Sequence, residues 1–133
     1  DKLTENLATE AHFTIARSAY ALTNTDLARR EFEETVKLSK HEMAAVAKYT
    51  LAQLEFDNSE YDKCEKSVFA LSEGYASYDY WVAKGFLLLS DVYVKKGNTF
   101  QAKSTLQSII DNYQGNDLVA IAKEKLAAIG ETQ

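Results

Sequence analysis

Apolar residues recur every three to four positions along almost the whole chain, which is the spacing of one face of an α-helix. No stretch alternates apolar and polar residues for long enough to indicate a β-strand. The pattern predicts seven helices, over residues 8–22, 25–38, 41–57, 60–72, 78–96, 99–112 and 117–129. Residues 1–7 either extend the first helix or complete another element. We therefore expect an all-α protein.

The residues between these segments include recognisable helix start and stop signals. Ser39 is followed three residues later by Glu42, a pattern that predicts a capping box at the start of the third helix. Gly97 lies where a helix is expected to end in a left-handed residue. Gly85 lies inside a predicted helix, where we expect close packing against a neighbouring helix or Trp81 to compensate for its low helix propensity.

The chain contains three copies of one pattern, offset by 36 and 38 residues. The first helix of each copy has a large apolar residue followed by a small one, at Ile15–Ala16, Leu51–Ala52 and Leu89–Ser90. The second helix has a small residue and, four positions on, a large one, at Ala28 and Phe32, Cys64 and Val68, and Ala102 and Leu106. Small side chains allow paired helices to approach to about 8–10 Å. We expect three helical hairpins, each of which covers the apolar edge of its neighbour.

This pattern resembles the tetratricopeptide repeat, a helix-turn-helix unit with a period of about 34 residues. The signature columns of the family are filled in the third copy by Phe86, Leu89, Ser90, Tyr93, Gly97, Ala102, Leu106 and Ile109. They are filled in the second copy by Leu51, Ala52, Tyr61, Cys64, Val68 and Leu71, and in the first by Ile15, Ala16, Ala28 and Phe32. The resemblance implies a right-handed superhelical α-solenoid, a single domain over 1–133 with repeats at about 9–38, 41–72 and 78–112. The amphipathic segment 117–129 is expected to cap it.

The copies depart from the family pattern at several positions. His12 and Lys48 stand where the family favours a large aromatic residue, Thr35 stands where it favours alanine, and no copy ends in the usual proline. The spacing is also longer, as in the segment at 72–80. These longer connections are similar to those in repeat domains of bacterial cell-envelope proteins, including proteins of outer-membrane assembly and the Tol-Pal system. That resemblance favours a periplasmic or outer-membrane-associated location over a cytoplasmic one.

Composition and charge limit the classes of partner. The chain has 133 residues and a net charge of −5, with 9 basic against 15 acidic residues over 1–80 and 6 against 5 over 81–133. An acidic surface repels nucleic acid, so we expect no nucleic-acid partner. No apolar run reaches the roughly 18 residues of a membrane span, so direct membrane insertion is not expected. Because the sequence begins with Asp1, we expect it to be a piece of a longer protein.

The residue types needed for catalysis or metal binding are scarce. The chain has two histidines and one cysteine, and it lacks the HExxH, CxxC and glycine-rich phosphate-binding patterns. His12 is expected at a hairpin surface and His41 in the first turn of a helix, with ordinary solvated or packing roles. Cys64 occupies a small-residue column, so we interpret it as a buried structural thiol. We expect no enzyme activity, no metal and no cofactor.

What remains is a binding surface. In the tetratricopeptide family the first helix of each unit lines a concave groove that holds a peptide or a partner's helix. The groove columns correspond here to Phe13, Arg17, Tyr20, Tyr49, Gln53, Phe56, Lys84, Asp91 and Lys95. Some members grip a C-terminal carboxylate in this groove, but only Arg17 and Lys84 are cationic in those columns, and the others hold Phe13, Thr50 and Leu88. That clamp is therefore not expected.

Two alternatives stay open. The aromatic groove residues, Tyr49 and Phe56 above all, could pack between repeats rather than bind a ligand. The aromatic cluster at 75–81 could likewise fill the gap beneath a long loop or form an exposed association patch. The leading hypothesis is a non-catalytic scaffold that binds a peptide or partner protein. The alternative is a structural module of a larger protein without a peptide ligand, which either spaces its parent protein or makes it self-associate; in the second case the chain forms a homo-oligomer.

Overall fold

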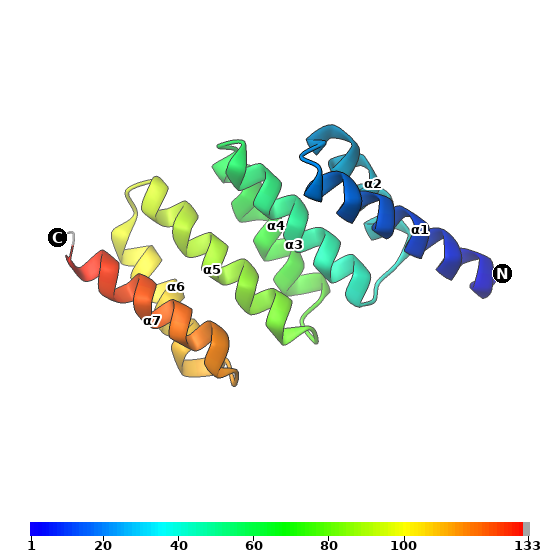
Figure 1. The fold of residues 1–133 in the computed structure, drawn as a ribbon. Helices are drawn as coiled ribbons and strands as arrows, with labels where there is room; N and C mark the ends of the chain where they lie inside the picture. Colours follow the sequence, from blue (N-terminus) through cyan, green and yellow to red (C-terminus); the bar gives the residue numbers. More distant parts are fainter. Residues whose placement is uncertain (132–133) are drawn as a thin grey trace.

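The computed structural model describes residues 1–131, and every regular element in that range is an α-helix (Figure 1). The helices are α1 (Lys2–Ala21), α2 (Thr25–Leu38), α3 (Glu42–Asp57), α4 (Tyr61–Gly74), α5 (Asp79–Lys95), α6 (Thr99–Asn112) and α7 (Asn116–Glu131). Each helix packs against the next one along the chain. The predicted fold class, an all-α helical-repeat solenoid, is confirmed. None of the described helices is both long and apolar enough to cross a bilayer.

The helix boundaries agree with the sequence prediction to within two residues, except at the start of the chain. There residues 2–7 extend the first helix, the first of the two alternatives, so α1 begins at Lys2 and the Asp1 carboxylate accepts a hydrogen bond from the Thr4 backbone N–H at 2.9 Å. The predicted capping box was wrong. Ser39 is the C-cap of α2, its hydroxyl accepts from the His41 N–H at 3.1 Å, and His41 rather than Ser39 is the N-cap of α3.

The turn inside each hairpin has the same backbone structure. Thr23, Ser59 and Gly97 occupy equivalent positions with φ of 59°, 60° and 78°. The backbone N–H of each of these residues donates to the carbonyl three residues earlier, at 2.9–3.1 Å. The N–H of the residue that follows donates to the carbonyl five residues before it, at 2.8 Å. This is the Schellman pattern of helix termination, which needs a left-handed residue. Only the third copy places glycine there, so only Gly97 could be predicted.

The small-residue columns lie where the helices touch, as predicted. Ala16, Ala28, Cys64 and Ala102 are fully buried, and Ala52 and Ser90 are 1% exposed. Gly85 supports the same picture, because a Cβ built on it would lie 3.2 Å from Leu71 Cδ2 and 3.4 Å from a methyl of Val68. The helices of neighbouring hairpins therefore approach so closely that a side chain at this position would be crowded.

The helices form two layers (Figure 1). The odd-numbered helices α1, α3, α5 and α7 lie side by side in front, the even-numbered helices lie behind them, and the two chain ends lie at opposite ends of the stack. Close backbone approaches join α1 to α3, α3 to α5 and α5 to α7, whereas within residues 1–131 no Cα atom of one even-numbered helix lies within 8 Å of another even-numbered helix. The odd layer is thus the inner face of the stack.

The long connection between α4 and α5 is filled by its own aromatic residues. Tyr75 is 5% exposed and packs with Ala44, Ala45 and Leu71, and Tyr78 and Trp81 lie partly buried against the same cluster. The cluster at 75–81 therefore fills the gap between hairpins. Its fourth ring differs, because Tyr80 remains 38% exposed beside the inner face.

Candidate functional site

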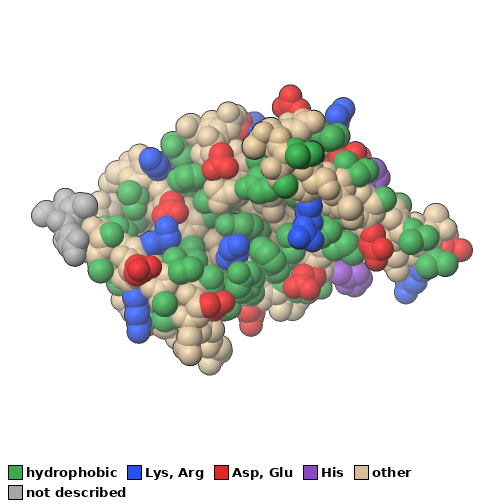
Figure 2. Space-filling model, in the orientation of Figure 1, with side chains coloured by type: hydrophobic (Ala, Val, Ile, Leu, Met, Phe, Trp, Pro, Cys, Tyr) green, Lys and Arg blue, Asp and Glu red, His purple; other side chains and the backbone are tan. Residues whose placement is uncertain are grey.

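A shallow depression lies on the inner face where α1, α3 and α5 come together. Its volume is about 280 Å³, and it is lined by Tyr20, Val46, Tyr49, Thr50, Gln53, Trp81 and Lys84. Hydrophobic side chains gather on this face over α3 and α5, with charged groups among them (Figure 2). Four of the predicted groove residues, Tyr20, Tyr49, Gln53 and Lys84, thus come from three repeats and line one depression. Thr50 was placed in a groove column by the sequence but not among the expected binding residues, and Val46 and Trp81 lie three residues before Tyr49 and Lys84, so extending the same periodicity would have identified them.

Lys84 is the centre of this depression. Its Nζ lies 4.9 Å from the centroid of the Tyr49 ring, 5.2 Å from that of Trp81 and 5.7 Å from that of Tyr80. These distances are within the range in which the face of an aromatic ring attracts a cation. The rings also support one another, since Tyr49 and Trp81 have centroids 5.8 Å apart and Tyr80 meets Trp81 edge-on at 5.0 Å. The ammonium is therefore held on an aromatic platform.

Tyr49 links this platform to the C-terminal end of α3. Its hydroxyl donates to Gln53 Oε1 at 3.3 Å, and Gln53 Nε2 donates to Asp57 Oδ1 at 2.9 Å. Burial, followed by the nearby Tyr20 and Asp91, raises the pKa of Tyr49 to about 12. The phenol stays neutral at physiological pH, so it serves as a hydrogen-bond donor and a ring surface.

The remaining predicted groove residues have partners within the chain or lie at the rim. The Arg17 guanidinium carbon lies 5.5 Å from the Phe13 ring centroid, and that ring packs edge-on against Phe32 at 6.3 Å. Phe56 packs on Tyr61 at 5.4 Å and joins the core between the second and third hairpins. Phe13 and Phe56 thus contribute to packing.

The C-terminal part of the inner face is occupied by α7. Lys125 of α7 donates to Asp91 Oδ1 and Oδ2 at 2.9 and 3.1 Å, so the carboxylate predicted to line the groove already has an ionic partner. Lys95 is exposed on the last turn of α5. The structure therefore brings together Tyr20, Tyr49, Gln53 and Lys84, and it leaves Phe13 with Arg17, Phe56, Asp91 and Lys95 outside the depression.

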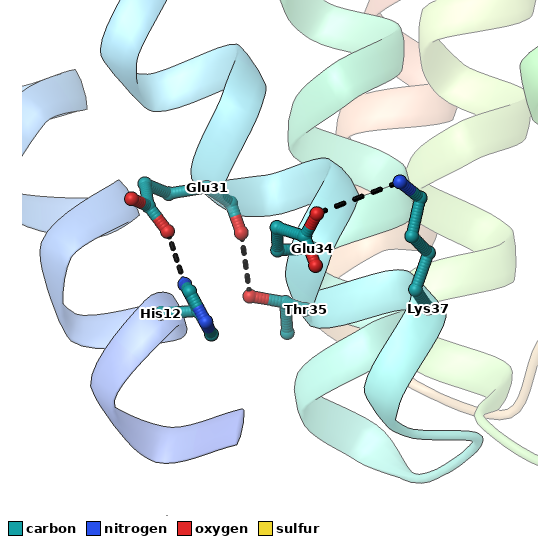
Figure 3. A network of polar contacts seen from close by, with 5 residues as sticks. All are labelled: His12, Glu31, Glu34, Thr35 and Lys37. Carbon is teal, nitrogen blue, oxygen red and sulfur yellow. Dashed lines mark hydrogen bonds and ion pairs between the residues drawn. The ribbon is translucent and has the colours of Figure 1, made fainter. Parts of the chain in front are cut away.

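His12 contributes to the link between the two helices of the first hairpin. Figure 3 shows its ring directed from α1 toward Glu31 on α2, where Nδ1 contacts Oε2. The backbone carbonyl of Glu31 accepts a hydrogen bond from the Thr35 hydroxyl at 2.9 Å, and Lys37 pairs with Glu34 at 3.5 Å. The expected position of His12 at a hairpin surface holds, because its side chain is 34% exposed, but its carboxylate partner was not predicted.

The other candidates for chemistry are structural. Cys64 is fully buried, and burial together with nearby carboxylates raises the pKa of its thiol to about 12, so it is not a thiolate at neutral pH. No group of three or more His, Cys, Asp or Glu side chains within residues 1–131 could hold a metal ion.

Residues 85–116, which cover most of α5 and all of α6, match the family model of the tetratricopeptide repeat. A search of curated proteins found no match to the chain. Tetratricopeptide repeats generally mediate protein–protein interactions and are generally not catalytic. The matched segment is the third hairpin, and the first two hairpins share its turn structure and its buried small residues. The third hairpin is thus similar to a tetratricopeptide repeat, and the first two hairpins share its backbone geometry.

Proposed function

We propose that the chain is a non-catalytic scaffold that binds a segment of a partner protein on the inner face of α1, α3 and α5. The observation that carries this proposal is the convergence of Tyr20, Tyr49, Gln53 and Lys84 from three hairpins on one open depression. Aromatic rings supply a large contact area with little conformational freedom to lose, and they are frequent anchors at interfaces. The match of the third hairpin to an interaction repeat supports the same conclusion.

The proposal is tested by affinity capture with the 133-residue chain as bait. We expect the double variant Arg17→Glu, Tyr49→Ala to lose partners that the unmodified chain retains, because it removes a cation and a ring from the inner face. The matched control is Arg30→Glu, Phe69→Ala, which makes similar changes at exposed positions on the even-numbered layer. If both double variants retain every partner equally, the inner face is not the binding surface.

A second candidate function is self-association, and a specific observation favours it. Leu3, Leu7 and Ile15 are 68%, 59% and 43% exposed on α1, at the N-terminal end of the stack. The equivalent of Ile15 in the third hairpin, Leu89, is 2% exposed because the second hairpin covers it. Sedimentation over a range of protein concentrations distinguishes self-association from partner capture. A dimer that Leu3→Ser, Leu7→Ser dissociates would favour the structural module, whereas a monomer favours partner capture.

For location, we propose a cell-envelope setting in a bacterium, with 1–133 acting as one repeat domain. This rests on the similarity of the long inter-hairpin connections to those of envelope repeat proteins, and 75–81 is the clearest example. Fractionation of cells that express the native gene, followed by immunodetection in the periplasmic, membrane and cytoplasmic fractions, tests it.

A further inference from the structure

The depression on the inner face has one charged residue among its seven lining residues, and that residue is Lys84. Within the part of the chain that the structure describes, no carboxylate oxygen lies at ion-pair distance from its ammonium. The ammonium lies over three aromatic rings. A ring face is a weaker hydrogen-bond acceptor than a carboxylate. Lys84 is thus a positioned cation without an anion.

Two of the neighbouring polar side chains, Thr50 and Gln53, already have hydrogen-bond partners. The Thr50 hydroxyl donates to the Val46 carbonyl at 2.8 Å, and Gln53 uses its oxygen for Tyr49 and its nitrogen for Asp57. A partner would therefore find one charged donor in the depression, surrounded by ring and aliphatic surface. An entering carboxylate would form a charge-assisted hydrogen bond there without breaking an existing ion pair.

The two ends of α3 limit how many anionic groups a partner can carry. Glu42 lies in the first turn and accepts from Trp81 Nε1 at 3.4 Å, whereas Asp57 is the last residue and accepts from Gln53. Both carboxylates accept hydrogen bonds from neutral donors, and neither has a lysine or arginine ion-pair partner among residues 1–131. A run of acidic residues laid along α3 would meet these charges, and like charges repel. A single carboxylate bound in the middle of the depression avoids the repulsion from both Glu42 and Asp57.

We propose that the depression recognises an internal partner segment that carries one Asp or Glu side chain flanked by apolar residues. The carboxylate binds Lys84, and the flanking side chains pack on Trp81 and Tyr49 and on the Tyr20–Val46 side. A chain terminus fits less well, because terminal carboxylates are usually held by several converging donors and this depression offers a single ammonium. This inference rests on the proposed function and specifies the chemistry of the partner.

The experiment uses short capped peptides and the 133-residue chain. Trp81 is the only tryptophan, so its fluorescence reports binding at the depression directly, and amide chemical shifts locate the site. The probes are Ala-Leu-Glu-Phe-Ala, the same peptide with Gln or Lys in place of Glu, and a peptide of five glutamates, each acetylated and amidated. We expect the single-Glu peptide to bind roughly fivefold more tightly than the Gln peptide, with shifts confined to α1, α3 and α5.

Three variants assign that preference to Lys84. Lys84→Gln is expected to abolish the difference between the Glu and Gln peptides, and Lys84→Arg is expected to keep it. The control is Lys66→Gln, which removes an exposed lysine from α4 on the other layer and is expected to change nothing. Preservation of the Glu preference in Lys84→Gln would overturn the inference.

The remaining outcomes are equally decisive. Equal binding of the Glu and Gln peptides, tighter binding of the Lys or five-glutamate peptide, or no binding of any peptide at the depression would each overturn the inference. None of these results decides whether the inner face captures partners, because the Arg17→Glu, Tyr49→Ala capture experiment tests that separately. Failure of the inference can therefore be told apart from failure of the proposed function.

Discussion

Lys125 on α7 bridges both carboxylate oxygens of Asp91 on α5, at 2.9 and 3.1 Å, and this contact attaches the last helix to the inner face. The two side chains are 33% and 37% exposed, so water and salt screen their attraction. The contact closes the groove on the C-terminal side, next to the aromatic platform around Lys84. It therefore separates the surface that a partner can use from the surface that α7 already covers.

We predict that Lys125→Met lowers the free energy of unfolding by about 0.5–1 kcal/mol, because a half-exposed ion pair contributes little more than that. Urea denaturation of both proteins measures the difference, and hydrogen exchange is expected to show faster opening of α7. The control is Lys123→Met on the exposed side of α7, for which no loss is expected. The Lys125→Met effect should shrink in 1 M NaCl by screening; an effect independent of salt would contradict an ionic origin.

The hairpin turns give a second prediction. Thr23 and Ser59 adopt the left-handed backbone that Gly97 adopts in the third copy, and this conformation costs a residue with a side chain about 1–2 kcal/mol. Replacement by glycine removes that strain but increases the entropy of the unfolded chain. We therefore expect Thr23→Gly to stabilise the protein by about 0.5–1 kcal/mol and Gly97→Ala to destabilise it by about 1 kcal/mol, measured by urea denaturation.

A glycine placed inside a helix serves as the control for the turn variants. Ser104 is exposed in α6, and Ser104→Gly is expected to lose about 0.5 kcal/mol through lower helix propensity. If Thr23→Gly and Ser104→Gly both destabilise the protein by the same amount, the left-handed turn is not strained.

The small-residue columns give a third prediction. Ala102 is fully buried beside Ala52 and Cys64, where neighbouring helices meet. We expect Ala102→Leu to destabilise the protein by roughly 1–3 kcal/mol through overpacking, seen as a lower melting temperature by circular dichroism. Ala127→Leu, an exposed position on α7, is the matched control and should leave melting unchanged. An unchanged melting temperature for Ala102→Leu would show that the repeat register is wrong.

Most of the helices could be predicted because their boundaries follow local patterns, and the failures have local causes as well. The sequence left open whether residues 1–7 extend the first helix, because Leu3 and Leu7 remain exposed and have no partner pattern, and the structure shows that they do, with Asp1 as the cap. The capping box at Ser39 failed because its backbone N–H is bonded to the Thr35 carbonyl at the end of α2. One residue rarely ends one helix and caps the next, and the sequence does not tell which role it takes.

The candidate site could be predicted only in part, because the partner of a side chain depends on tertiary structure. The resemblance placed both Tyr49 and Lys84 on the groove face, and in the structure Lys84 Nζ lies 4.9 Å from the centroid of the Tyr49 ring. Asp91 belongs to the same face by periodicity, yet a lysine 34 residues further on pairs with it. Phe56 turns to Tyr61 across its own hairpin. The helical period indicates which face a side chain shares but not which neighbour it contacts.

The buried thiol gives the last prediction, which concerns pH. Burial and nearby carboxylates raise the pKa of Cys64 to about 12 in the folded protein, whereas a free thiol in the unfolded chain has a pKa of about 8.5. The Cys64 thiol holds its proton more tightly in the folded state than in the unfolded state. Its contribution to the free energy of unfolding is therefore fully present below pH 8.5 and is lost as the pH rises toward 12. From pH 8 to pH 10 this loss amounts to about 2 kcal/mol.

Urea denaturation of the unmodified protein and of Cys64→Ala at both pH values isolates this term, because the other titrating groups are common to the two proteins. We expect the free energy of unfolding of the unmodified protein to fall by about 2 kcal/mol more than that of the variant between pH 8 and pH 10. Alkylation provides an independent readout, since the native thiol should resist iodoacetamide at pH 8 and react once urea unfolds the chain. Rapid alkylation of the native protein, together with equal pH slopes, would mean that the thiol is accessible and that the small-residue column at Cys64 does not lie between packed helices.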